Sequence, residues 1–210
     1  MSLDDTNIWI EELTPELPLK SANHQTFIAW IEQLESENEC EYERISFNAT
    51  GELVYVDIQE TYATDEDLLP LKQMRHLEHL NICANEVTDV GLAHLSELSK
   101  LKYLDAGFNP ITDAGLKHLH KMNDLETLVI NGTEDIGSIT DQGILHLATL
   151  DNLTGLHLNS AQITDDSVRL LEQFQKLRIL DIGGTLISDS GIGKIRQSLP
   201  NCRIDTQPIA

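Results

Sequence analysis

The stretch "VTDVGLAHL" at residues 87–95 decides the fold, because close copies of it return along the chain. "ITDAGLKHL" occupies residues 111–119, and "ITDQGILHL" occupies residues 139–147. Each copy follows a short apolar run, and the runs begin at Leu53, Leu77, Leu101, Leu125, Leu153 and Leu177. This spacing of 24 residues, lengthened to 28 in the fourth unit, predicts a stack of similar structural units.

The first half of each unit predicts a strand. The six runs read "LVYVDI", "LEHLNI", "LKYLDA", "LETLVI", "LTGLHL" and "LRILDI". Their fourth and sixth positions are apolar or small, whereas the third and fifth positions mix polar and apolar residues. An alternation with period two is typical of a strand that is buried on one face.

The second half of each unit predicts a short helix that begins beside a hydroxyl–carboxylate pair. Apolar residues follow the pair at a spacing of three, as at Leu92, Leu95 and Leu98. A Thr or Ser side chain can accept a hydrogen bond from the first turn of a helix, and a neighbouring Asp suits the positive end of the helix dipole. The pairs are Thr64-Asp65, Thr88-Asp89, Thr112-Asp113, Thr140-Asp141, Thr164-Asp165 and Ser188-Asp189.

The pattern L-x-x-L-x-L-x-x-(N/T)-x-(I/V)-T-D-x-G-L-x-x-L-x-x-L over residues 53–204 resembles leucine-rich repeats. It is most similar to the bacterial subtype with ITDxGLxxL repeats, which is related to the leucine-rich repeats of F-box proteins. The resemblance implies an α/β solenoid of right-handed strand–turn–helix units. In such a solenoid the strands form a parallel concave sheet and the helices form an outer layer.

Two recurring positions test this resemblance. Asn85 and Asn109 occupy a turn position that suits asparagine, but Thr61, Thr133, Ala161 and Thr185 occupy it elsewhere, so we expect only a partial asparagine ladder. Glycine recurs three residues after the hydroxyl cap, which predicts close packing between adjacent helix starts. These glycines are Gly91, Gly115, Gly143 and Gly191, and the other two units have Asp67 and Ser167 instead.

We divide the chain into an N-terminal extension and cap at residues 1–52, six repeats at residues 53–204 and a tail at residues 205–210. The cap is predicted to contain a helix whose apolar face carries Phe27, Trp30, Ile31 and Leu34, followed by a hairpin over "YERISFNATGELVYVDI". At the other end, Pro200 is expected to end the last helix, and Cys202 and Ile204 are expected to lie on a last strand.

Charge and cysteine content limit the partners. The chain has 35 acidic and 14 basic residues, which gives a formal net charge of −21. This charge repels phosphates and anionic lipids, so we expect no nucleic acid and no membrane as partner, and favour a protein with a basic surface. Three cysteines without a C-x-x-C pair argue against disulfides and structural zinc. With no secretory signal visible in the sequence, we expect a cytoplasmic protein without cofactors.

The candidate site follows from the register of the repeats. Third and fifth strand positions are expected to face the concave side, where equivalent residues of neighbouring repeats lie about 4.8 Å apart. A row of Tyr55, His79 and Tyr103 would then be flanked by polar residues and one more aromatic ring. We assign partner binding to Tyr55, Asp57, His79, Asn81, Tyr103, Asp105, Phe108 and His157. The insertion "EDIGS" should add a rim loop with Glu134, Asp135 and Ile136.

Three classes of function remain at this point. The first is a non-enzymatic protein–protein recognition module that binds through the concave face. The second, implied by the F-box resemblance, is a substrate-recognition subunit of a ubiquitin-ligase-like complex. The third is a hydrolase or a metal-dependent enzyme with His79 as a base or ligand, but no activated Ser or Cys nucleophile is visible in the sequence.

Overall fold

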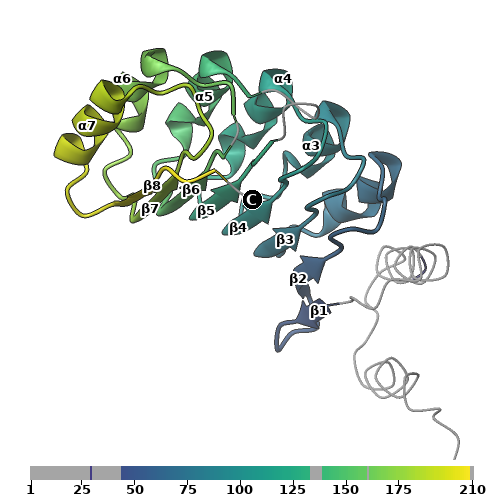
Figure 1. The fold of residues 1–210 in the computed structure, drawn as a ribbon. Helices are drawn as coiled ribbons and strands as arrows, with labels where there is room; N and C mark the ends of the chain where they lie inside the picture. Colours follow the sequence, from purple (N-terminus) through teal and green to yellow (C-terminus); the bar gives the residue numbers. More distant parts are fainter. Residues whose placement is uncertain (1–28, 30–43, 133–138, 160, 209–210) are drawn as a thin grey trace, which may run out of the picture.

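The computed structural model of the protein describes residues 29, 44–132, 139–159 and 161–208. In this part of the chain, eight strands form one sheet in chain order. The strands lie on the inner side of a curved stack, and the helices lie on its outer side (Figure 1). The predicted solenoid with a parallel sheet and an outer helical layer is therefore confirmed.

Seven of these strands run parallel, and the first pairs with the second in an antiparallel hairpin. The hairpin and the last strand were both predicted. The later repeat strands begin two residues after the leucine that opens each repeat, because that leucine still closes the preceding turn: the Leu77 N–H donates to the Met74 carbonyl. The strands are β1 Arg44–Phe47, β2 Leu53–Asp57, β3 His79–Asn81, β4 Tyr103–Asp105, β5 Thr127–Val129, β6 Gly155–His157, β7 Ile179–Asp181 and β8 Arg203–Asp205.

The outer layer consists of short α and 3-10 helices. None of the described helices is long and apolar enough to cross a bilayer. The apolar residues predicted for the cap helix, Phe27, Trp30, Ile31 and Leu34, lie outside the described residues, and the last helix ends before Pro200 as predicted. The helices are η1 Glu66–Gln73, α3 Asp89–Leu95, α4 Asp113–Leu116, η2 Lys117–Lys121, α5 Asp141–His146, η3 Leu147–Thr149, η4 Asp165–Ser167, α6 Val168–Leu171 and α7 Asp189–Ser198.

The centre of the core is a row of leucines, one from each of the strands β3 to β7. Leu80, Leu104, Leu128, Leu156 and Leu180 are paired in register and have no exposed surface. Paired residues are 24 positions apart except between β5 and β6, where Thr127 pairs with Gly155. The insertion is therefore absorbed outside the strands, and the sheet keeps its register.

Hydrogen bonds from one repeat to the next align the helix starts. The Thr88 hydroxyl accepts from the Val90 N–H, as a helix cap should. The Thr88 N–H and hydroxyl also donate to the Asp65 carboxylate of the preceding repeat, at 2.7 and 2.6 Å. The same contact joins Asp89 to Thr112, Asp113 to Thr140, Asp141 to Thr164 and Asp165 to Ser188. The predicted caps are confirmed in these five units, but each aspartate also binds the following repeat.

The recurring glycines make room for these carboxylates. The glycines concerned are Gly91, Gly115, Gly143 and Gly191. A Cβ atom on any of them would come closer than 3.0 Å to the Oδ1 atom of the capping-pair aspartate in the preceding repeat. The predicted close packing at the helix starts is therefore confirmed.

The two units without this glycine have Ser167 and Asp67 in its place, and these side chains form hydrogen bonds at the helix start. Ser167 donates its hydroxyl to Asp141. In the first unit, Asp67 accepts from both the N–H and the hydroxyl of Thr64 at 2.8 Å. The prediction that Thr64 caps a helix was wrong, because no earlier repeat supplies an aspartate and Asp67 takes that role within the unit.

The turns hold a partial ladder of asparagines, as predicted. The buried Asn85 side chain accepts from the N–H groups of Thr61 and Ala63 and donates to the carbonyls of Ile58 and Ile82. Asn109 makes equivalent contacts one repeat later. Sequence reasoning missed Asn159, a buried side chain two positions earlier in its unit, which accepts from the Gly183 N–H.

Leu104→Ala is expected to lower the free energy of unfolding by about 2–5 kcal/mol, through lost burial and the cavity left behind. Urea denaturation followed by circular dichroism measures the change. An unchanged midpoint would mean that Leu104 does not lie in the core.

Gly115→Ala and Gly193→Ala should have opposite effects. Adding a Cβ at Gly115 pushes against Asp89 and should cost about 1–3 kcal/mol. Gly193 lies inside α7, and a Cβ there would meet nothing within 4 Å, so alanine should stabilise the protein by about 0.5–1 kcal/mol. Thermal melts of the two variants test the contact, and a stabilised Gly115→Ala protein would contradict it.

Asp141→Asn should destabilise the protein at neutral pH by about 1–2 kcal/mol, because an amide cannot accept all the donors that Asp141 binds. Burial opposes ionisation of Asp141, but hydrogen bonds from Ser167 and Thr164 outweigh it and lower the pKa below 3.8. The stabilisation is thus fully present above pH about 3.8 and is lost as the pH falls through the lowered pKa. Urea midpoints across this range should converge for the two proteins. Asp166→Asn, which removes the same charge from an exposed carboxylate, should shift little at any pH.

Candidate functional site

The concave face is the side of the sheet that the helices leave uncovered (Figure 1). Residues predicted to share a row on this face are paired from strand to strand. The third-position row contains Tyr55, His79, Tyr103, Thr127, Gly155 and Ile179. The fifth-position row contains Asp57, Asn81, Asp105, Val129, His157 and Asp181.

The three rings of the third-position row lie side by side, with His79 tilted against Tyr55 and stacked on Tyr103. The ring centroids of Tyr55 and His79 are 6.0 Å apart, and those of His79 and Tyr103 are 5.8 Å apart with an interplanar angle of 19°. These separations are typical of favourable aromatic pairs. The predicted row is confirmed, and we call Tyr55, His79 and Tyr103 the ring row.

The ring row is only partly exposed to solvent. His79 is exposed, whereas Tyr103 is half-buried although its position on the concave side was predicted. The stacked neighbour explains this, and burial together with the nearby Asp105 raises the pKa of Tyr103 to about 12. The Tyr103 hydroxyl therefore stays protonated and can donate a hydrogen bond at neutral pH.

Phe108 lies in the turn after β4 and is also half-buried. Its φ is +56°, in the left-handed region that bulky residues rarely adopt. The equivalent turn positions hold Glu60, Ala84 and Gly184, which also have positive φ. The positive φ is thus a feature of the repeat backbone. The turns at Ala84 and Gly184 adopt it without an aromatic side chain.

The polar residues beside the ring row accept hydrogen bonds from the turns that follow the strands. Asp57 is 8% exposed and accepts from the Gln59 N–H at 3.2 Å, and Tyr55 donates its hydroxyl to the other Asp57 oxygen at 3.4 Å. Asn81 and Asp105 accept in the same way from the N–H two residues ahead. Burial raises the pKa of Asp105, assisted by the Asp57 charge and opposed by the Gly107 N–H and His157.

His157 lies further along the face and forms an ion pair that sequence reasoning missed. Its Nδ1 atom is 2.5 Å from Asp181 Oδ2 on the next strand. The other oxygen, Asp181 Oδ1, is buried without a hydrogen-bond partner. The spacing of 24 residues between the two positions was the available signal.

The described residues do not assemble an evident catalytic or metal centre. The pKa of Cys83 is raised to about 12 by burial and by Asp105, Glu60 and Asp57, so its thiol is not a nucleophile at neutral pH. Within the described ranges, no Ser or Thr hydroxyl hydrogen-bonds to the oriented His157. The same ranges contain no group of three or more His, Cys, Asp or Glu side chains that could hold a metal ion.

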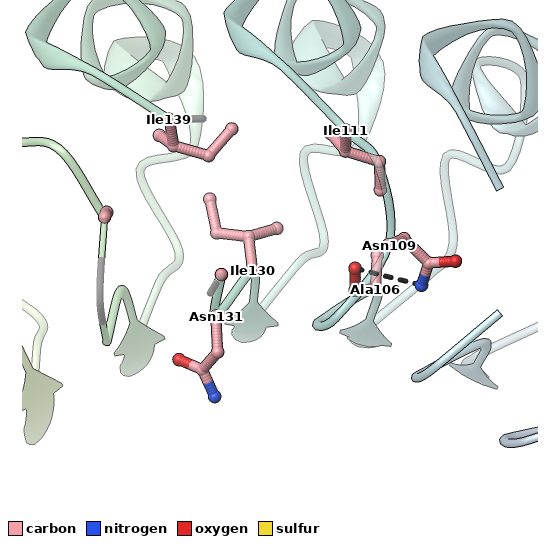
Figure 2. Close-up of a pocket in the computed structure, with 8 residues that line it drawn as sticks. Ala106, Asn109, Ile111, Ile130, Asn131 and Ile139 are labelled. Atoms are coloured by element: carbon pink, nitrogen blue, oxygen red, sulfur yellow. Dashed lines mark hydrogen bonds between the residues drawn. The ribbon is translucent and has the colours of Figure 1, made fainter. Parts of the chain in front are cut away.

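The predicted rim-loop residues Glu134, Asp135 and Ile136 lie outside the described residues. Among the described residues, Ile111, Ile130 and Ile139 point toward a common void, while the amide of Asn131 points away (Figure 2). The void measures about 10 Å³, which is room for about one water molecule. It is therefore too small to bind an organic ligand.

Comparisons with known proteins support the same architecture. A family model described as "Leucine Rich repeat" matches residues 73–96 and 97–119. An internalin (inlF) from Listeria monocytogenes is 26% identical with a TM-score of 0.56, over 65% of this chain and 36% of that one. The chain thus spans little more than a third of that internalin.

Two further structures show likeness in fold alone. Internalin C2 (inlC2) from Listeria monocytogenes is 22% identical with a TM-score of 0.54, over 87% of this chain and 85% of that one. A pollen receptor kinase 3 is 15% identical with a TM-score of 0.50, over 80% and 78%. Comparison with curated protein sequences finds no match. The protein has a leucine-rich-repeat fold.

Proposed function

We propose that this leucine-rich-repeat protein is a non-enzymatic recognition module that binds another protein through its concave face. Leucine-rich-repeat proteins are generally protein-interaction modules. The observation that carries the choice of face is the ring row, in which the centroids of neighbouring rings are 5.8–6.0 Å apart. Preordered aromatic rings offer a large contact area at little entropic cost, and such residues dominate the binding energy of many interfaces.

Phe108 extends this surface beyond the end of β4. A phenylalanine in a left-handed turn is unfavourable for folding, and alanine or glycine serves the equivalent turns at Ala84 and Gly184. A contact with a partner gives the ring a role that the fold does not require. The rim loop with Glu134, Asp135 and Ile136 is proposed to border the same surface.

The proposal also covers the absence of catalysis, the class of partner, the repeat subtype and the location of the protein. The half-buried Cys83 thiol, whose pKa is raised, and the flat surface around His79 favour binding over catalysis. The net charge of −21 disfavours nucleic acid and anionic membranes as partners. The aspartate–glycine contacts between helix starts favour the bacterial ITDxGLxxL subtype of repeat, and we propose a cytoplasmic location from the cysteine content.

Tyr103→Ala and Phe108→Ala should each weaken partner binding by more than about 1 kcal/mol, or about fivefold in Kd, because each removes an aromatic contact. Partners are captured on immobilised protein from a lysate of the source organism and identified by mass spectrometry. Calorimetric titration of the purified partner then gives the affinities. Because Tyr103 is half-buried, all titrations are made well below the melting temperature of each variant.

Lys117→Ala is the matched control, since Lys117 is exposed on the helical side. It should leave the affinity unchanged. Binding that survives both aromatic truncations but is lost in Lys117→Ala would place the interface on the convex side and contradict the proposal.

A further inference from the structure

The carboxyl-terminal ends of the strands form an acidic border of the concave face. Among the described residues of β2–β8 and the turns that follow them, from the fifth strand position to the last turn residue, there is no Lys or Arg. The basic side chains of the sheet lie nearer the strand starts, where Lys102 is already paired with Glu78 at 2.6 Å. The acidic residues of this border are Asp57, Glu60, Glu86, Asp105, Asp181 and Asp205.

The turns do not explain these negative charges. Asp57 and Asp105 each accept one N–H from the turn, and Asn81 does the same on the strand between them with a neutral amide. Asparagine would therefore serve the fold equally well. A charged carboxylate that is largely buried without a cation is unfavourable, and burial accordingly raises the pKa of Asp105.

No described Lys or Arg side chain forms an ion pair with either carboxylate, although the pairing of β1 with β2 places Arg44 opposite Asp57. The ion pairs in this part of the protein involve Glu52, Glu78, Glu97 and Asp181, and neither Asp57 nor Asp105 takes part in one. Each is two residues from a tyrosine of the ring row on the same strand and face, Asp57 from Tyr55 and Asp105 from Tyr103. A guanidinium or ammonium group is stabilised by both an aromatic face and a carboxylate.

We propose that the concave face binds a basic, extended segment of the partner, with Arg or Lys side chains placed against the ring row and the Asp57 and Asp105 carboxylates. This proposal rests on the proposed function and specifies the chemistry of the partner. Asp57 and Asp105 are two strands apart, which is about 10 Å. In a segment with polyproline II conformation, which has three residues per turn, residues three positions apart point the same way and span about 9 Å. A segment crossing the strands with cations at every third residue would therefore reach both carboxylates.

The test uses a fluorescein-labelled peptide with arginine at every third position and glycine or serine elsewhere. Its matched control replaces arginine with citrulline, which has nearly the same shape but no charge. Fluorescence anisotropy measures binding to the full chain at about 0.15 M salt, where surface charges more than about 8 Å apart are largely screened. The arginine peptide should bind and the citrulline peptide should not.

Asp57→Asn and Asp105→Asn should each weaken binding of the arginine peptide by about tenfold, because a cation in a partly desolvated site loses its counter-charge. Asparagine keeps the acceptor for the turn N–H, so both variants should fold. Asp166→Asn removes the same charge from the exposed helical side and should leave the affinity unchanged. Tyr103→Leu should also weaken binding, because it removes the aromatic face.

Three outcomes would overturn the inference: no binding of the arginine peptide, equal binding of the citrulline peptide, or an equal loss in Asp166→Asn. The proposed function would still stand if Tyr103→Ala weakened binding of a captured partner while Asp57→Asn and Asp105→Asn left its affinity unchanged. If the peptide binds as expected but no captured partner responds to Tyr103→Ala or Phe108→Ala, the cation site stands and the proposed partner interface fails.

Discussion

The hydrogen bonds from each Thr or Ser cap to the aspartate of the preceding repeat are the constraint on which the rest of the structure depends. The Asp89 carboxylate, for example, accepts from the Thr112 N–H and hydroxyl at 2.8 and 2.7 Å. One contact thus fixes where the next helix begins and excludes a Cβ at Gly115. Because the helix starts are tied together, the parallel strands beneath them keep the register that aligns both rows of the concave face.

Much of this architecture could be predicted because short sequence patterns specify each unit and these patterns recur along the chain. Alternation gives the strands, the Thr-Asp pair gives the helix starts, and the constant period places Tyr55, His79 and Tyr103 side by side. The role of the aspartates could not be read in the same way, since their partners lie one repeat away and depend on the angle between units. The first unit shows the limit most clearly: Thr64-Asp65 looks like the other pairs, but Thr64 binds Asp67 because no repeat precedes it.

The candidate site was predictable to a similar degree. Which residues share a row follows from the period, but ring angles, burial and ion pairing do not. Tyr103 is half-buried because His79 stacks on it, and His157 pairs with Asp181 because their side chains meet between strands. The insertion after β5 was expected to bulge beside the face. The strand register across it shows that the face continues unbroken from Thr127 to Gly155.

Aspartate has two different roles in this protein, and the contrast bears on function. On the helical side, Asp141 accepts from the Thr164 N–H and hydroxyl and from the Ser167 hydroxyl, so its charge is well compensated. On the concave side, Asp105 accepts the Gly107 N–H and interacts with the Tyr103 hydroxyl and the Cys83 thiol, which are neutral donors. The first set of contacts joins neighbouring repeats, whereas the second leaves the Asp105 charge without an ion-pair partner among the described side chains. The acidic residues therefore differ in role: the outer carboxylates hold the repeats together, whereas Asp105 on the concave face forms no ion pair with a described side chain.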